Sequence, residues 1–195
     1  MGRSKNVLVG VAPQTISRNS PELIENNPMS NITEILNSGG VMRYHAQPDI
    51  QCQSTAEHMW GVAVLLIKFY PDATASMIKA ALVHDCGEVE IGDMPAPTKR
   101  AHPDLKKIIQ SLEHHQLNTW ELNFEIELST EELKKIKICD VLEGLWYTAR
   151  QVRRTNMGHE VLIKWVEYAR SLNLNQMQRS FIDATGAYHL LKGFI

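Results

Sequence analysis

The segment from Ser129 to Arg154 constrains the fold most strongly, because it predicts one long helix. It opens on a capping box, 129–132, in which the serine oxygen and a glutamate side chain each satisfy an amide that the helix start leaves free. Asp140 falls well inside this helix, between Ile138 and Val141. An unpaired carboxylate is costly to bury among apolar side chains, so Asp140 is expected to have a specific partner.

The rest of the chain carries helical patterns too, and no alternating strand pattern of any length. A second capping box, 54–57, predicts a helix over Thr55–Phe69 that ends before Pro71. Asp72 can cap a following helix that continues through Cys86. Further helices are predicted over 31–37, 104–122, 158–171 and 175–191. The predicted fold class is therefore all-α, a single compact helical bundle.

Length and breaks in the pattern predict one domain. A chain of 195 residues can bury one sizeable core. Residues 1–30 hold three prolines among many Asn and Ser, so we expect an extended or loosely ordered arm before a domain of residues 31–195. A polar loop is expected at 41–53. A rigid loop is expected at 94–99, where Pro95 and Pro97 fix their own φ angles.

Charge, cysteine usage and the length of the apolar runs argue against several classes of protein. A net charge of -2 and a pI near 6.4 give no basic face for a nucleic-acid polymer, although a small phosphorylated ligand needs only a few local cations. Cys52, Cys86 and Cys139 form an odd set without CxxC spacing and are expected to be reduced. The apolar runs at 7–12 and 62–67 are too short for a signal sequence or a membrane span, so we expect the protein to be located in the cytoplasm.

Two histidines and two aspartates suggest a metal site. His58 lies in the first turn of the 55–69 helix, and the doublet His84-Asp85 lies near the end of the next helix. With Asp140 they form a mixed nitrogen and oxygen set drawn from three helices, which suits a catalytic divalent metal better than a closed structural site. Each residue alone has a plainer explanation, as a hydrogen-bonded core histidine or a surface charge.

Four segments resemble a known family: MRYH (42–45), AEH (56–58), HDCGEVEIGDMPAPTK (84–99) and the CD pair (139–140). They are similar to the HD-domain metal-dependent phosphohydrolases, and more narrowly to the compact 5'-deoxynucleotidases and the small deoxynucleoside triphosphate hydrolases that act on dATP. The resemblance covers about residues 36–150. It implies an all-helical fold, one divalent transition metal per subunit and a homo-oligomer, a dimer or higher.

The resemblance also implies residue roles. The implied metal ligands are His58, His84, Asp85 and Asp140, and the metal is Co²⁺, Mn²⁺ or Zn²⁺ because Mg²⁺ suits histidines least. Glu88 matches the catalytic carboxylate that orients water or moves its proton, although a solvated charge at a helix end is the alternative reading. Asp93 matches a second carboxylate that contacts the sugar hydroxyl or the leaving side.

Other matches concern the substrate. Arg43 and Lys99 match the family's phosphate-contacting cations. Tyr44 stands where the 5'-deoxynucleotidases carry a tryptophan that packs against the sugar and helps exclude a 2'-hydroxyl. Tyr147 lies on the same helix face as Asp140 and is a candidate to stack on the base, with core packing as the alternative.

The leading hypothesis is an enzyme that removes the 5'-phosphate or phosphates from 2'-deoxynucleotides and releases the deoxynucleoside, with deoxyadenosine nucleotides favoured. A triphosphate needs extra cations, which Arg100, Lys106, Lys107 or a neighbouring subunit could supply. The rival enzyme class cleaves cyclic nucleotides or signalling pyrophosphates, and the segment 92–99 argues against it. A third reading is a non-catalytic, metal-stabilised module that binds nucleotides or partner proteins.

Overall fold

The computed structural model describes residues 28–194, with side chains from residue 31, and it is built almost entirely of helices. The all-α prediction is therefore confirmed. The α-helices are α1 (Pro28–Ser38), α2 (Thr55–Phe69), α3 (Ala75–Val83), α4 (Ala96–Ala101), α5 (Pro103–Thr119), α6 (Thr130–Thr155), α7 (His159–Ser171), α8 (Gln176–Thr185) and α9 (Ala187–Leu190). Two short 3₁₀ helices, η1 (Cys86–Val89) and η2 (Phe124–Glu127), and two strands, β1 (Met42–Arg43) and β2 (Gln53–Ser54), complete the set.

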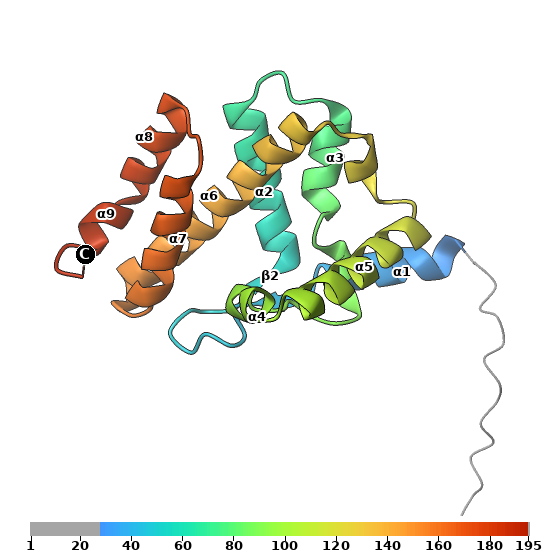
Figure 1. Ribbon diagram of the computed structural model, residues 1–195, viewed down its shortest axis with the longest axis horizontal. Coiled ribbons are helices and arrows are strands. Elements are labelled where there is room, and N and C mark those ends of the chain that lie inside the picture. The colour runs from blue at the N-terminus through green and yellow to red at the C-terminus, as the bar shows by residue number, and fades with distance from the viewer. Residues whose placement is uncertain (1–27, 195) are drawn as a thin grey trace, which may run out of the picture.

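Helix α6 is the central element of the fold. It runs diagonally through the molecule, with α2 and α3 on one side and α7 to α9 on the other (Figure 1). The core includes apolar side chains that recur at helical spacing and are at most 1% exposed, among them Val62, Leu66, Leu142, Leu145, Leu162 and Val166. Each fully buried side chain of this size contributes about 1.5–3 kcal/mol. Packing on both sides thus fixes the middle of α6, which carries Asp140.

The helix caps agree with the sequence in part. The capping box that opens α6 is complete. At α2 only half of the box forms, because Ser54 accepts from the Glu57 amide while its own backbone belongs to β2. Helix α3 is capped by Thr74 instead of Asp72, and it ends at Val83 instead of Cys86. The doublet at 84–85 therefore lies at the junction between α3 and η1, where the chain leaves the regular helix.

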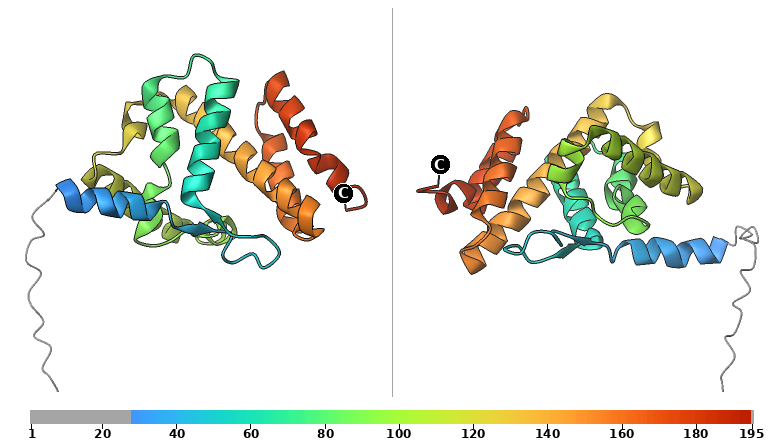
Figure 2. Two further views of the ribbon diagram at one scale, coloured as in Figure 1. Left: turned by 180° about the vertical axis from the view of Figure 1, so that it is seen from behind. Right: turned by 60° about the horizontal axis from the view of Figure 1, so that its bottom comes forward.

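Two segments predicted as loops contain regular structure. Residues 96–101 form α4, in which Pro95 occupies the N-cap position and Pro97 lies in the first turn, where a missing N–H breaks no helical hydrogen bond. Within 41–53, β1 and β2 pair in antiparallel register, Met42 with Ser54 and Arg43 with Gln53. Figure 2 shows this hairpin and α1 lying across the N-terminal end of α2.

The ends of the chain also differ from expectation. Helix α1 begins at Pro28, three residues before the predicted domain boundary, and the rest of the predicted arm, residues 1–27, lies outside the described residues. Gly186, at φ +70°, divides the predicted 175–191 helix into α8 and α9. All three cysteines are free, as predicted. Among residues 28–194, no helix combines the length and the apolar character that crossing a bilayer requires.

Candidate active site

The four residues predicted as metal ligands lie together at the meeting point of α2, α3 and α6. His58 Nε2 is 3.2 Å from Asp140 Oδ1 and 3.6 Å from Asp85 Oδ2. His84 Nε2 is 3.5 Å from Asp85 Oδ1. One ligand atom from each of His58, His84 and Asp140 lies within 4.8 Å of the others. Segments more than 80 residues apart thus present nitrogen and oxygen atoms to one point.

The hydrogen bonding of the two histidines fits a metal at this point. Both Nε2 atoms are buried, and within the part of the chain that the structure describes neither has a hydrogen-bond partner. Their Nδ1 atoms are engaged, that of His84 with the Ala81 carbonyl at 3.0 Å and that of His58 with Glu143. A carbonyl accepts only from N–H, so the His84 proton resides on Nδ1 and its Nε2 lone pair is free to coordinate. Two such nitrogens and two carboxylates suit a divalent transition metal.

Charges around the aspartates keep both in the ionised form that coordination needs. Burial opposes ionisation of Asp140, but Lys137, which hydrogen-bonds Oδ2, and next His58 hold its pKa well below the usual value. Burial likewise opposes ionisation of Asp85, and here His84 and His58 lower the pKa. At neutral pH the candidate metal site is therefore lined by two negative carboxylates.

Glu88 is a buried acid beside this point. It lies in η1 and is 5% exposed, and its Oε2 has no hydrogen-bond partner among the described residues. Lys99 Nζ is 3.8 Å from its other oxygen. Burial, and next the negative charge of Asp85, raises the pKa of Glu88 to about 9. A carboxyl group in this position exchanges a proton near neutral pH more readily than an exposed glutamate does.

The burial of Glu88 predicts how the stability of the metal-free protein depends on pH. The pKa of Glu88 rises on folding from 4.5 to about 9, so across this interval the folded chain keeps a proton that the unfolded chain loses, and stability falls as pH rises. Glutamine does not titrate. In a chelating buffer, Glu88→Gln should therefore raise Tm relative to wild type more at pH 8 than at pH 5. Exposed Glu90→Gln is the control, and an equal Tm difference at both pH values would contradict the prediction.

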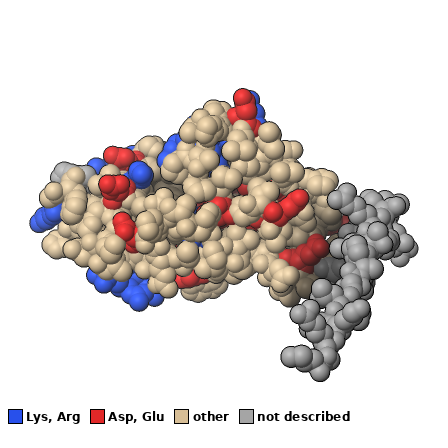
Figure 3. Space-filling view, turned by 90° about the horizontal axis from the view of Figure 1, so that it is seen from below, with Lys and Arg blue, Asp and Glu red and all other residues tan. Residues whose placement is uncertain are grey.

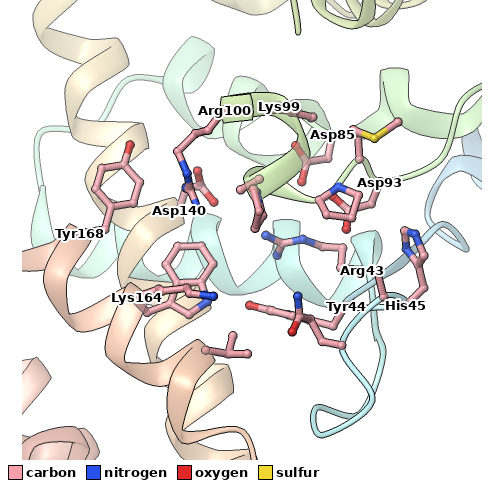
Figure 4. Close-up of a pocket in the computed structure, with 18 of the residues that line it drawn as sticks. Arg43, Tyr44, His45, Asp85, Asp93, Lys99, Arg100, Asp140, Lys164 and Tyr168 are labelled. Atoms are coloured by element: carbon pink, nitrogen blue, oxygen red, sulfur yellow. The ribbon is translucent and has the colours of Figure 1, made fainter. Parts of the chain in front are cut away.

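A cavity of about 320 Å³ opens beside the four clustered residues. Of the residues predicted to act in the site, those that line it are Arg43, Tyr44, Asp85, Glu88, Asp93, Lys99 and Asp140. Figure 4 shows the guanidinium of Arg43 reaching into the middle of this group, between Asp140 and Asp85. The cavity is thus lined by a cluster of carboxylates with cations around it. This arrangement suits a phosphate ester bound through a metal.

Helix α7 supplies a wall that the sequence analysis did not predict. Lys164, Trp165 and Tyr168 line the cavity from this helix, and Lys137 lines it from α6. Of the cations considered for a triphosphate, Arg100 lines the cavity, whereas Lys106 and Lys107 are not among its lining residues. Elsewhere, the face shown in Figure 3 carries Lys and Arg in small separate groups on a mostly uncharged surface.

Tyr44 forms an aromatic wall, and Tyr147 lies behind it. The two rings stack with centroids 5.6 Å apart and planes 11° apart. Tyr147 is 3% exposed, donates its hydroxyl to the carbonyls of Gln51 and Cys52, and is not among the residues that line the cavity. Tyr44 itself is at φ +63°, in the left-handed region that bulky residues seldom adopt. Tyr147 therefore reaches the cavity only through the Tyr44 ring, which it supports.

Glu143 carries a buried carboxylate beside His58 that the sequence did not predict. It is 1% exposed; its Oε1 accepts from Gln53 Nε2 at 2.7 Å, and its Oε2 faces His58 Nδ1. Arg43 Nη1 is 3.6 Å from the same Oε2. The available signal was its position three residues after Asp140, which places the two on one face of α6.

Comparisons with known proteins agree with this architecture. A family model described as "HD domain" matches residues 40–136. The dATP triphosphohydrolase of Cyanophage S-2L is 29% identical over 120 residues, which cover 58% of this chain and 67% of the relative.

Two solved structures share the fold. One is the Cyanophage S-2L HD phosphohydrolase (DatZ) bound to dA and one catalytic Zn²⁺ ion, with a TM-score of 0.60, 23% identity, and coverage of 82% of this chain and 96% of that one. The other is the PH0347 protein from Pyrococcus horikoshii OT3, with a TM-score of 0.61, 21% identity, and coverage of 81% and 98%. At identities of 23% and 21%, the likeness to these two structures concerns the fold alone.

Proposed function

Because the chain belongs to the HD-domain family, we propose that it is a metal-dependent phosphohydrolase that removes the 5'-phosphate or phosphates from 2'-deoxynucleotides and releases the deoxynucleoside. The observation that carries this proposal is the convergence of His58, His84, Asp85 and Asp140 beside the buried Glu88, at the edge of a cavity bordered by cations. The named activity of the 29% identical phage relative supports the substrate class.

The four clustered residues would hold one divalent ion, and the proposed ion is Zn²⁺, Co²⁺ or Mn²⁺. An ion of this kind supplies a Lewis acid that polarises a phosphoryl oxygen and lowers the pKa of a water molecule. The zinc named for the phage structure of the same fold makes Zn²⁺ the first ion to test.

Glu88 is proposed to move the proton during hydrolysis. Water attacks phosphorus and the bond from phosphorus to the 5' oxygen breaks, while Glu88, which is protonated at neutral pH because of its raised pKa, gives its proton to that leaving oxygen and takes one from the attacking water. Its unpartnered Oε2 is the atom available for this transfer. Asp93, which lines the same cavity, is proposed to contact the sugar hydroxyl or the leaving side.

The cations of the cavity favour a triphosphate over a monophosphate. Arg43 can grip two phosphate oxygens, and Lys99 adds a point charge. Two more cations, Arg100 and Lys164, line the cavity, whereas Lys137 lines it while paired with Asp140. Four positive side chains exceed what one phosphoryl group needs. We therefore place dATP ahead of dADP and dAMP, with the Tyr44 ring packing against the deoxyribose.

Lys164 tests this preference. A hydrogen bond to a charged group contributes about 1.5–3 kcal/mol, so Lys164→Met should raise KM for dATP about 10-fold or more and raise KM for dAMP less. Steady-state kinetics on both substrates measure the difference. The matched control is Lys134→Met, whose lysine is exposed on α6 and paired with Glu131. Equal effects on dATP and dAMP would argue for a monophosphate site.

A homo-oligomer is also proposed, from the family resemblance and from one surface feature. Trp60, Val64 and Ile67 recur at helical spacing on α2 and are 63%, 42% and 53% exposed. An exposed apolar stripe of this kind commonly marks a contact with another chain. Light scattering after size exclusion measures the mass of the particle.

One assay decides among the candidate functions. The protein is incubated with dNMPs, dNTPs, NMPs and cyclic nucleotides in the presence of Zn²⁺, Co²⁺, Mn²⁺ or Mg²⁺, and the products are resolved by chromatography. The expected product is a deoxynucleoside, formed fastest from deoxyadenosine nucleotides. Cleavage of cyclic nucleotides alone would favour the rival enzyme class, and the absence of any metal-dependent product would favour a binding module.

A further inference from the structure

We infer that Glu143 is a positioning residue that holds the His58 ring in the tautomer and orientation needed to coordinate the metal. The inference rests on the proposed function, because it assigns a partner to one of the proposed ligands. It concerns a buried carboxylate that the proposed hydrolysis does not otherwise use.

The contacts of Glu143 give each of its two oxygens its own donor. Its Oε2 accepts from His58 Nδ1, and this places the ring proton on the side away from Asp85 and Asp140. The Nε2 lone pair is then directed at the cluster. A carboxylate hydrogen-bonded to the distal nitrogen of a metal-binding histidine fixes the ring and increases its basicity.

The surroundings hold the carboxylate in this position. Gln53 Nε2 donates to Oε1 at 2.7 Å, and Arg43 Nη1 lies 3.6 Å from Oε2. Gly61 lies one helical turn after His58 on α2, and a Cβ there would lie 2.7 Å from Glu143 Cγ. The absence of a side chain at 61 therefore provides the space that the glutamate occupies. A buried charge with these partners is compensated, whereas in an apolar core it would be costly.

The first test is Glu143→Gln, with Co²⁺ affinity as the readout. Both oxygens of Glu143 accept hydrogen bonds, so an amide must present its NH₂ group to one of the two donors. We expect the Co²⁺ dissociation constant, measured by visible absorption or calorimetry, to rise about 10- to 100-fold. Excess Co²⁺ should restore most of the activity. Gln151→Met is the matched control, since Gln151 is a buried polar residue on the same helix that does not line the cavity.

A swap separates positioning from a general structural role. Adding Gln53→Glu to Glu143→Gln returns an acceptor to face the amide NH₂, so the amide oxygen is free to accept from His58 Nδ1. We expect the double variant to bind Co²⁺ about 10-fold more tightly than Glu143→Gln, within the usual coupling for residues of one hydrogen-bond network.

Gly61→Ala probes the same contact from the other side. The new methyl group must displace the glutamate, so Co²⁺ affinity should fall although the carboxylate remains. Alanine favours a helix over glycine, so a weaker helix α2 is not the expected cause.

The outcomes separate this inference from the proposed function. Wild-type Co²⁺ affinity in Glu143→Gln, or no recovery in the double variant, would overturn the inference and leave the proposed function in place. Weaker Co²⁺ binding by Glu143→Gln in a protein that hydrolyses none of the nucleotides would support the inference and reject the function. A wild-type protein that takes up no Co²⁺ would overturn both.

Discussion

Glu88→Gln is expected to lower kcat about 10²- to 10⁴-fold, the usual contribution of a general acid or base. Glutamine keeps the size of the side chain but cannot carry the proton, and Glu88 is not one of the four residues proposed to hold the metal. The Co²⁺ dissociation constant should therefore stay close to the wild-type value. Steady-state kinetics with dATP at saturating Co²⁺ measure the loss.

The control for this variant is Glu90→Gln, which changes an exposed glutamate two residues away. It should leave kcat unchanged. Full activity of Glu88→Gln would mean that another group moves the proton, and Asp93 is then the remaining carboxylate of the cavity to test.

Asp140→Asn is expected to abolish both metal binding and turnover. The amide keeps the shape of the side chain but removes the charge that Lys137 and His58 now stabilise. Loss of a direct ligand should cost more than the roughly 10- to 100-fold typical of an outer partner. Visible absorption of the Co²⁺ protein measures the affinity, and chromatography of a dATP reaction measures the turnover.

Asp72→Asn is the matched control, because Asp72 is an exposed aspartate paired with Lys135. We expect it to bind Co²⁺ with the affinity of the wild-type protein. Retained Co²⁺ affinity in Asp140→Asn would remove Asp140 from the ligand set and place the ion elsewhere in the cavity.

Much of the fold could be predicted because its signals are local. The capping box at 129–132 and the long amphipathic pattern after it predict α6, and the structure confirms it as Thr130–Thr155. The predicted end of α3 was wrong because Cys86 already belongs to a 3₁₀ helix. Short-range competition of this kind between helix types leaves no periodic pattern to detect.

The clustered residues could be predicted because their chemical types are unusual for their places. Asp140 among apolar neighbours in the sequence required a partner, and the structure places His58, His84 and Asp85 beside it. The mixed donor set then indicated a metal. Their roles as ligands remain a prediction.

The rest of the site depends on tertiary packing. Lys164, Trp165 and Tyr168 reach the cavity only because α7 packs against α6, and in the sequence they have the pattern of an ordinary amphipathic helix. The spacing of Glu143 from Asp140 places the two on one face of α6, but its pairing with Gln53 joins residues 90 positions apart. Contacts over such separations are set by the whole fold and have no local sequence signal.

The most direct test of the proposed metal site is anomalous X-ray diffraction at the cobalt edge from crystals of the Co²⁺-loaded protein. We expect one peak per chain, about 2.0–2.2 Å from His58 Nε2, His84 Nε2 and an oxygen of each of Asp85 and Asp140. A peak that these side chains do not surround, or no peak at all, would contradict the metal site on which the proposed hydrolysis depends.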